Sequence, residues 1–193
     1  MTTTRSDQFD LRGFHHVALV SRDMQDTVDF YEGILGFPLV KTLQLGPDGQ
    51  HFFFQVTEDE GVAFFWFRNV NPAQPGVASA DWYAGETTPK SARGLVSKAA
   101  PGAMHHLSFG VPEDKLEEYR HRLIEAGVEV TDIVTHHDEN GEVIRSIFFR
   151  DPDGIMLEFS AWAQPLAAGT SDFVPAAAGD AAVRRRDGIP YTL

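Results

Sequence analysis

The chain has 193 residues, of which 42% are hydrophobic, so it is long enough for one sizeable domain or for two small modules that share a core. Its 28 acidic and 16 basic residues give a formal net charge of −12, which argues against a surface for nucleic acid or anionic membranes. The chain has no cysteine, so a metal would have to be held by nitrogen and oxygen. No stretch has the length of a signal-peptide core or a membrane span, and we expect a soluble cytoplasmic protein.

The first half of the chain has the pattern of a strand, a helix and further strands. Apolar residues alternate over Phe14–Val20, which predicts a strand. Asp23 is placed to cap a helix that runs toward Leu35, and Gly36 is placed to end it. Strand-forming residues follow, broken by turns, the second of which is the acidic stretch Thr57–Gly61. The predicted order is β-α-β-β-β.

The second half repeats this order. Another alternating run is followed by a helix that begins at Pro112 and is ended by Gly127. A strand-like segment, Val128–Val134, comes next, and turns are predicted at 139–141 and 151–154. The repetition indicates an internal duplication.

A long segment rich in Pro, Ala, Gly and Ser separates the two copies. It is either a surface excursion or a loop that folds over a site with Trp82 and Tyr83 as anchors. The Ala- and Gly-rich tail is expected to be solvated or packed on a neighbouring subunit. We therefore divide the chain into a first module, a connection, a second module and a tail, at residues 12–68, 69–102, 103–162 and 163–193.

Two histidine doublets lie at matching positions of the two copies. His15-His16 and His105-His106 each open an alternating apolar run, and Glu158 lies in an apolar run after the last predicted turn. Two imidazoles and one carboxylate on rigid strands would form a facial metal triad with open positions. Either doublet alone would favour buried histidines bonded to the backbone, but the repetition with a matching carboxylate favours a metal site. Strand alternation does not decide which histidine of each doublet is the ligand.

These segments resemble the vicinal oxygen chelate superfamily, which includes glyoxalases, bleomycin-resistance proteins, fosfomycin-resistance transferases and extradiol ring-cleaving dioxygenases. The resemblance implies an α+β fold of two paired βαβββ modules, whose curved mixed sheets surround a metal-centred cavity. The family pattern assigns His16, His106 and Glu158 as metal ligands. The matching segments are His-His-Val-Ala-Leu (15–19), Phe-Tyr…Leu-Gly-Phe (30–37), His-His-Leu-Ser-Phe (105–109) and Phe-Arg-Asp-Pro-Asp-Gly…Leu-Glu-Phe (149–159).

Alignment of the two copies places Phe65 opposite Glu158. Glyoxalases and related epimerases use a residue there as a ligand or a proton-transferring base, and Phe can do neither. Proton-shuffling isomerisation is therefore disfavoured relative to chemistry on a three-ligand metal with an open face. The resemblance to extradiol dioxygenases implies a divalent metal, for which we expect Fe(II), with Mn(II), Ni(II) or Zn(II) as alternatives.

The resemblance to dioxygenases is incomplete in its acid–base residues. The tyrosine of that family would fall where this chain has Phe148. Its second-shell histidine has no clear match, and His51 is the candidate to replace it as a catalytic residue. His136 and His137 would reach the rim of the site. Each of these histidines has an equally plausible role as a packing or solvent-facing residue.

Phenylalanines are concentrated in the predicted strands around the metal, and alternation should direct about half of them into the cavity. Phe is also a common strand and core residue, so the preference for an aromatic or apolar substrate is only a tendency. The candidate substrate-binding residues are Phe53, Gln55, Phe65 and Phe148.

Three functions follow from these observations. The first is a metal-dependent oxidoreductase of the dioxygenase-like branch, which acts on a small metal-chelating molecule and uses dioxygen. The second is a metal-dependent lyase or isomerase, or a transferase of the fosfomycin-resistance kind. The third is a metal-free drug-binding protein, against which the complete triad argues. The partners expected are a small-molecule substrate and a second copy of the chain in a homodimer, with no nucleic acid and no membrane.

Overall fold

A computed structural model of the chain describes residues 13–68, 104–138, 141–164, 173–174 and 184–185. The chain divides into one compact unit over 12–164 and a second unit made of 1–11 and 165–193. In the second unit, β9 (Phe173–Val174) and β10 (Arg184–Arg185) pair antiparallel. The predicted connection, with Trp82 and Tyr83, lies outside the described residues, and so do the first two residues of the 139–141 turn. No helix in the described part of the chain has the length and hydrophobicity needed to cross a membrane.

The first module has the predicted βαβββ order. Its sheet has the strand order β1-β4-β3-β2, in which β1 is parallel to β4 and the other pairs are antiparallel. The elements are β1 (His16–Val20), α1 (Met24–Val28), the π-type turn η1 (Asp29–Ile34), β2 (Leu39–Gln44), the 3-10 turn η2 (Gly46–Asp48), β3 (Gly49–Gln55) and β4 (Gly61–Phe67).

The second module has the same topology, with the strand order β5-β8-β7-β6 and one parallel pair, β5 with β8. The structure therefore confirms an α+β fold with two mixed four-stranded sheets. The elements are β5 (Leu107–Gly110), the 3-10 turn η5 (Glu113–Lys115), α2 (Leu116–Glu125), β6 (Val134–Asp138), β7 (Gly141–Arg150) and β8 (Met156–Trp162).

The helix of the first module starts where the sequence predicts. The Asp23 carboxylate accepts hydrogen bonds from the backbone N–H groups of Gln25 at 2.9 Å and Asp26 at 3.3 Å. After one α-helical stretch the helix widens, and the Leu35 N–H bonds to the carbonyl of Phe30, five residues back. Gly36 then has a φ of +73°, which ends the helix as predicted. The sequence gives no signal for the wide turn, because its apolar spacing also fits an ordinary α-helix.

The segment after Gly127 differs from the prediction. The sequence predicts a strand over Val128–Val134, but β6 begins only at Val134, and before it a single bridge joins Val130 to Phe149. Val128, Val130 and Ile133 pack against the core instead. The prediction was wrong about this segment because β-branched residues are favoured by burial as well as by strand pairing.

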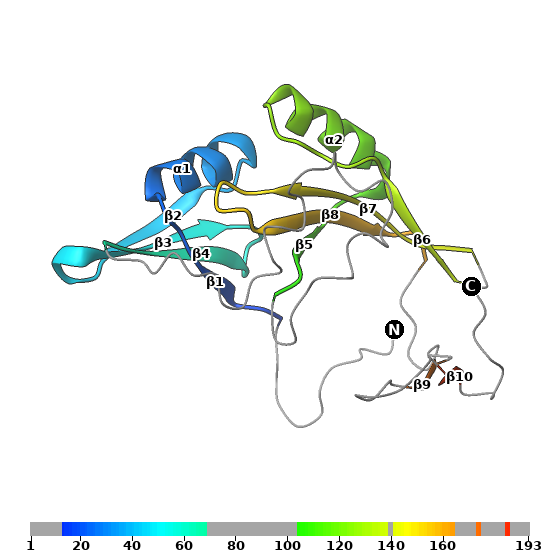
Figure 1. Ribbon diagram of the computed structural model, residues 1–193, viewed down its shortest axis with the longest axis horizontal. Coiled ribbons are helices and arrows are strands. Elements are labelled where there is room, and N and C mark those ends of the chain that lie inside the picture. Colours follow the sequence, from blue (N-terminus) through cyan, green and yellow to red (C-terminus); the bar gives the residue numbers. More distant parts are fainter. Residues whose placement is uncertain (1–12, 69–103, 139–140, 165–172, 175–183, 186–193) are drawn as a thin grey trace. The chain divides into compact units, whose positions relative to one another are not determined.

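Each sheet has one face covered by its helix, and α1 and α2 lie over these faces in Figure 1. Alternate residues of the strands enter the core beneath the helices, including Phe54, Phe64, Ile147, Phe149 and Leu157, which are at most 2% exposed. The other alternate residues lie on the opposite face of each sheet, which we call the site face. Because side chains alternate, one strand register determines both the core and the residues of the site face.

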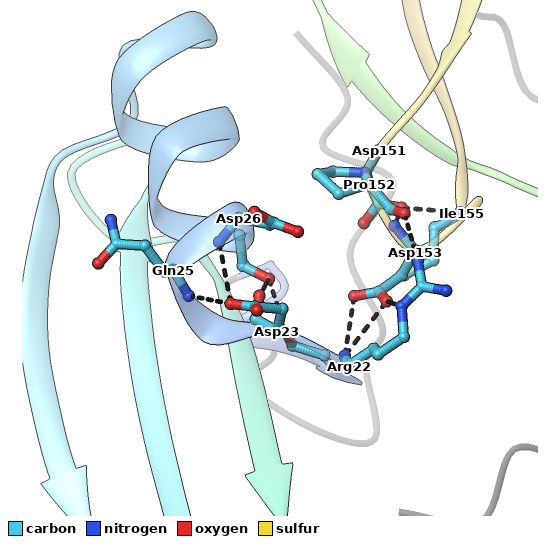
Figure 2. A network of polar contacts seen from close by, with 10 residues as sticks. Arg22, Asp23, Gln25, Asp26, Asp151, Pro152, Asp153 and Ile155 are labelled. Atoms are coloured by element: carbon cyan, nitrogen blue, oxygen red, sulfur yellow. Dashed lines mark hydrogen bonds and ion pairs between the residues drawn. The ribbon is translucent and has the colours of Figure 1, made fainter.

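Polar contacts join the two modules beside α1 (Figure 2). The backbone N–H of Arg22 donates to both carboxylate oxygens of Asp153 at 3.2 Å, and the Arg22 guanidinium donates to the carbonyl of Pro152 at 3.0 Å. Tyr31, which is fully buried, donates through its hydroxyl to Asp151 at 3.1 Å. The 151–154 turn of the second module is thus bonded to Arg22, just before α1, and to Tyr31 in η1.

Candidate metal centre

A buried carboxylate and an imidazole meet on the site face of the second module. Glu158 lies in β8 between Leu157 and Phe159, and it is only 6% exposed. Its Oε2 is 3.1 Å from Nε2 of His106, whose side chain is one-third exposed. A carboxylate in an apolar strand is costly unless it is paired, and His106 supplies the partner.

The surroundings of Glu158 keep it ionised. Burial raises its pKa, but hydrogen bonding from His106 and Ser108 lowers it, and the result is a pKa below the usual value. The Ser146 hydroxyl is buried and has no hydrogen-bond partner among the described residues. We therefore attribute most of the lowering to His106. A carboxylate that stays charged and has one imidazole beside it is the donor pair that a divalent metal takes.

The two histidine doublets have the same geometry. In each, the Nδ1 atoms of the two rings are 2.7 Å apart, between His15 and His16 and between His105 and His106. The ring centroids are 5.0 Å apart in both doublets, and the rings are nearly perpendicular. Because Nδ1 of His106 contacts its neighbour, Nε2 is the atom that it presents to Glu158.

Each second histidine also contacts a phenylalanine at an equivalent strand position. His16 lies edge-to-face with Phe53 at 5.7 Å between centroids, and His106 lies edge-to-face with Phe148 at 5.8 Å. In the strand registers, Phe53 pairs with Ala63 and Phe148 pairs with Glu158. The duplication therefore extends to the site face of both sheets.

These registers correct the alignment of the two copies. Ala18 pairs with Ala63 in the first module, and the equivalent Ser108 pairs with Glu158 in the second. Ala63 is therefore the counterpart of Glu158, and Phe65 lies two residues farther along β4. The prediction of Phe65 was wrong because the alignment matched Gly61 with Gly154. In the structure Gly61 pairs with Gln55 as Met156 pairs with Arg150, so Gly61 is the counterpart of Met156. Alanine cannot bind a metal either, so the first module still supplies no carboxylate.

His51 lies on the site face of the first module in an aromatic cluster. Its ring stacks on Phe65 at 3.6 Å and meets Phe53 edge-to-face at 4.1 Å. Its Nδ1 is 3.1 Å from the carbonyl oxygen of Phe64, and the side chain is 7% exposed. Nδ1 must carry the proton in this bond, so Nε2 of the neutral ring has a lone pair. The proposed acid–base role of His51 stays a prediction.

The remaining predicted residues have other contacts. The Gln55 side-chain amide donates to the carbonyl of Glu58 at 3.3 Å, within the β3–β4 turn. His136 and His137 are exposed on β6, and Nε2 of His137 is 3.9 Å from Glu142. The substrate-binding role of Gln55 and the rim position of His136 and His137 stay predictions.

The structure brings two of the three predicted ligands together. His106 and Glu158 are in contact, whereas His16 lies at the exposed start of β1, in contact with His15 and Phe53. Within the described ranges, no group of three or more His, Cys, Asp or Glu is arranged to hold a metal ion. The separation of 3.1 Å between Nε2 and Oε2 suits two ligands of one ion, each at about 2.0–2.2 Å. The pair thus fits a metal and needs further ligands to complete the site.

Sequence analysis missed a group of serines around Glu158. Ser108 and Ser160 have Oγ atoms 2.8 Å apart, and Ser146 is paired with Ser160 across β7 and β8. Strand alternation places all three serines on the same face of the sheet as Glu158. This alternation is the sequence signal that would have identified them. They make the site face of the second module polar, while Phe53, Phe65 and Phe67 make that of the first module aromatic.

Two cavities of about 340 and 440 Å³ lie against residues at the end of the first helix such as Ile34. Neither is lined by His16, His106 or Glu158 in the described part of the molecule. Phe148, which contacts His106, lines the smaller cavity, and Ser108, which pairs with Glu158, lines the larger one.

Comparison with known proteins gives one family. The model described as "Glyoxalase/Bleomycin resistance protein/Dioxygenase superfamily" matches residues 13–159. Two curated relatives are similar to the chain. The putative ring-cleaving dioxygenase MhqE of Bacillus subtilis (strain 168) is 28% identical over 165 residues, which are 84% of this chain and 45% of MhqE. Glyoxylase I 4 of Arabidopsis thaliana is 27% identical over 154 residues, which are 77% of this chain and 70% of that protein. The chain thus spans less than half the length of MhqE.

Solved structures have the same fold. The crystal structure of SMU.1112c is 25% identical, has a TM-score of 0.56, and the match covers 78% of this chain and 98% of that one. The glyoxylase/bleomycin resistance protein/dioxygenase domain from Frankia sp. EAN1pec is 20% identical, has a TM-score of 0.57, and the match covers 81% and 96% of the two chains.

Proposed function

Because this chain belongs to the Glyoxalase/Bleomycin resistance protein/Dioxygenase superfamily, we propose that it is a divalent-metal-dependent enzyme of the extradiol dioxygenase-like kind. Its substrate is a small molecule that chelates the metal. The contact between His106 and the buried, ionised Glu158 is the observation that carries the proposal. A binding protein without a metal has no need to pay the desolvation cost of that carboxylate.

The metal is held by His106, Glu158 and His16 in this proposal. When bound, it would polarise two neighbouring oxygens of the substrate and bring dioxygen beside them; Fe(II) is the ion expected. The open positions follow from the absence of a fourth protein ligand at Ala63.

His16 comes from a second copy of the chain in this proposal. It is exposed at the start of β1, and β1 is an edge strand of its sheet. A partner chain in a symmetric dimer can therefore reach this histidine, and the same operation completes a second site. This arrangement accounts for the incomplete triad in the described residues of one chain.

The protein side chains have separate tasks. Glu158 contributes negative charge, which offsets that of the cation, and His106 and Ser108 stabilise its ionised form. The rings of Phe53 and Phe65 offer an apolar surface to the substrate body. His51, with its proton on Nδ1, accepts a proton from a substrate hydroxyl at Nε2. Isomerisation of the glyoxalase kind is disfavoured, because neither Ala63 nor Phe65 can move a proton.

Anaerobic purification, metal analysis and oxygen uptake with a panel of catechols test this function. We expect oxygen consumption with at least one catechol after loading with Fe(II), and none after chelation of the metal. Metal binding without oxygen uptake would favour the lyase, isomerase or transferase alternative. A protein that binds no divalent metal would contradict the proposal.

A further inference from the structure

The first histidine of each doublet has no role in the proposed reaction, yet both make the same contact. The Nδ1–Nδ1 distance is 2.7 Å in both doublets, and the angle between the rings is 73° in one and 79° in the other. A hydrogen bond between two ring nitrogens needs one N–H and one lone pair. The tautomers of the two rings in a doublet are therefore coupled.

We propose that His105 and His15 are positioning residues, which hold Nδ1 of His106 and His16 so that Nε2 of each faces the metal. The inference rests on the proposed function for the identity of the ligand at Nε2. A metal-ligating histidine ordinarily donates its other N–H to a carboxylate or a backbone carbonyl, which fixes the ring and its tautomer. Here a second imidazole occupies that place.

An imidazole has an advantage over a carboxylate as this partner, because it can reverse the hydrogen bond. Without metal, the His106 ring donates from Nε2 to Glu158 at 3.1 Å, so its Nδ1 accepts from His105. With metal, the Nε2 lone pair is needed, so the proton lies on Nδ1 and is donated to Nδ1 of His105. The proton on Nε2 of His106 is released, and Nε2 of His105 takes one up. Neither ring changes its net charge, and the orientation of His106 is kept in both states.

The two doublets differ in exposure, and this predicts unequal effects. The contact between His105 and His106 is partly buried, whereas that between His15 and His16 is exposed. Water can replace a lost hydrogen bond more readily at the exposed doublet. Loss of His105 should therefore weaken metal binding more than loss of His15.

The first test reads the tautomer of His106 in the metal-free protein, by ¹⁵N chemical shifts of histidine-labelled full-length chain. We expect a single tautomer with the proton on Nε2 in the wild type and a mixture in His105→Ala. His105→Asn restores an amide near the place of Nδ1 and should restore the single tautomer. His105→Gln, which places its amide farther out, is the matched control and should resemble His105→Ala. A tautomer of His106 that is unchanged in all three variants would overturn the proposal.

The second test is calorimetry with Zn(II) on the same four proteins. We expect His105→Ala and His105→Gln to bind Zn(II) about 10- to 100-fold more weakly than the wild type, and His105→Asn to recover most of the loss. Equal affinity in all four would overturn the positioning role. If the wild type itself bound no Zn(II), the proposed function would fail, while the tautomer measurement would still decide whether His105 orients His106.

Discussion

Two buried carboxylates in this protein have opposite protonation tendencies. Glu158 and Asp151 are each 6% exposed. Contact with His106 lowers the pKa of Glu158 despite its burial. For Asp151, burial is the largest effect and the nearby Asp153 adds to it, so its pKa rises to about 6 although Tyr31 and two backbone N–H groups donate to it. The neighbouring groups thus make Glu158 a carboxylate suited to a cation, whereas Asp151 is a carboxylate that joins the two modules.

The raised pKa of Asp151 predicts a pH-dependent stability. Because the pKa of Asp151 in the folded protein, about 6, lies above the usual aspartate value of 3.8, the folded state holds the proton more tightly. Stability from this group is complete below about pH 4 and is lost as the pH rises through about 6, on the order of 2–3 kcal/mol in all. Asp151→Asn keeps the acceptor for the backbone N–H groups without the charge. We expect urea unfolding to show a more stable variant at pH 8 and little difference at pH 4.

Tyr31→Phe is the companion variant, because it removes the hydroxyl that donates to Asp151 and keeps the aromatic packing. We expect a loss of about 1.5–3 kcal/mol at pH 8, where the acceptor is charged, and a smaller loss at pH 4. Identical pH profiles for the wild type and Asp151→Asn would show that Asp151 does not titrate as described.

Variants of the metal centre separate ligands from acid–base residues. Glu158→Gln removes the charge with little change of shape, and His106→Ala removes a ligand, so both should lower metal content and activity together. His51→Ala should keep the metal content and lower turnover by roughly 100-fold or more. Metal analysis and steady-state kinetics on the three proteins check this. Full activity in metal-free Glu158→Gln would rule out metal catalysis, and unchanged turnover in His51→Ala would assign His51 a packing role.

At the level of helices and strands, the sequence predicts those features that depend on the residue types at a few neighbouring positions. The cap at Asp23, the helix ends at Gly36 and Gly127 and the βαβββ order follow from residue types at fixed positions. The sequence does not predict the wide turn after α1, because its helical spacing has the same apolar positions. The sequence alignment matched Gly61 with Gly154, although Gly61 begins β4 and Gly154 lies in the turn before β8. Phe65 therefore shares the correct face with Ala63 but lies two residues away from the position opposite Glu158.

The corrected register leads to a test with two matched variants. Ala63→Glu places a carboxylate at the counterpart of Glu158, and Phe65→Glu places one two residues away on the same face. We expect Ala63→Glu to bind Zn(II) at least about tenfold more tightly, and to be less stable without metal because Ala63 is fully buried. Phe65→Glu should leave the Zn(II) affinity nearly unchanged. Calorimetry that gave the reverse order would favour the original alignment.

At the scale of the whole molecule, each of the duplicated modules has a histidine doublet, but only the second has a carboxylate, Glu158, at the position where the first has Ala63. The first module instead has an aromatic site face around His51. The candidate site therefore needs both modules, and the sequence shows this division by its motifs. What the sequence could not predict is which chain supplies each ligand, because the motifs are identical for a site within one chain and a site shared by two.

Subunit complementation distinguishes these arrangements. His16→Ala and Glu158→Gln should each bind little metal alone. If His16 comes from a second chain, mixed dimers of the two variants contain one intact site, and random exchange should restore about one quarter of the wild-type Zn(II) sites. Metal analysis after co-refolding measures this fraction, with each variant refolded alone as control. No recovery above the single variants would place His16, His106 and Glu158 of one site in the same chain.

The proposed metal centre is tested most directly by anomalous diffraction from crystals of the full chain soaked in Zn(II). We expect one anomalous peak per chain, bound by Nε2 of His106, the carboxylate of Glu158 and Nε2 of one His16, at about 2.0–2.2 Å from each. The peak should be absent from crystals of Glu158→Gln. A wild-type crystal with no peak at Glu158, or with the ion held by other residues, would contradict the metal-dependent function.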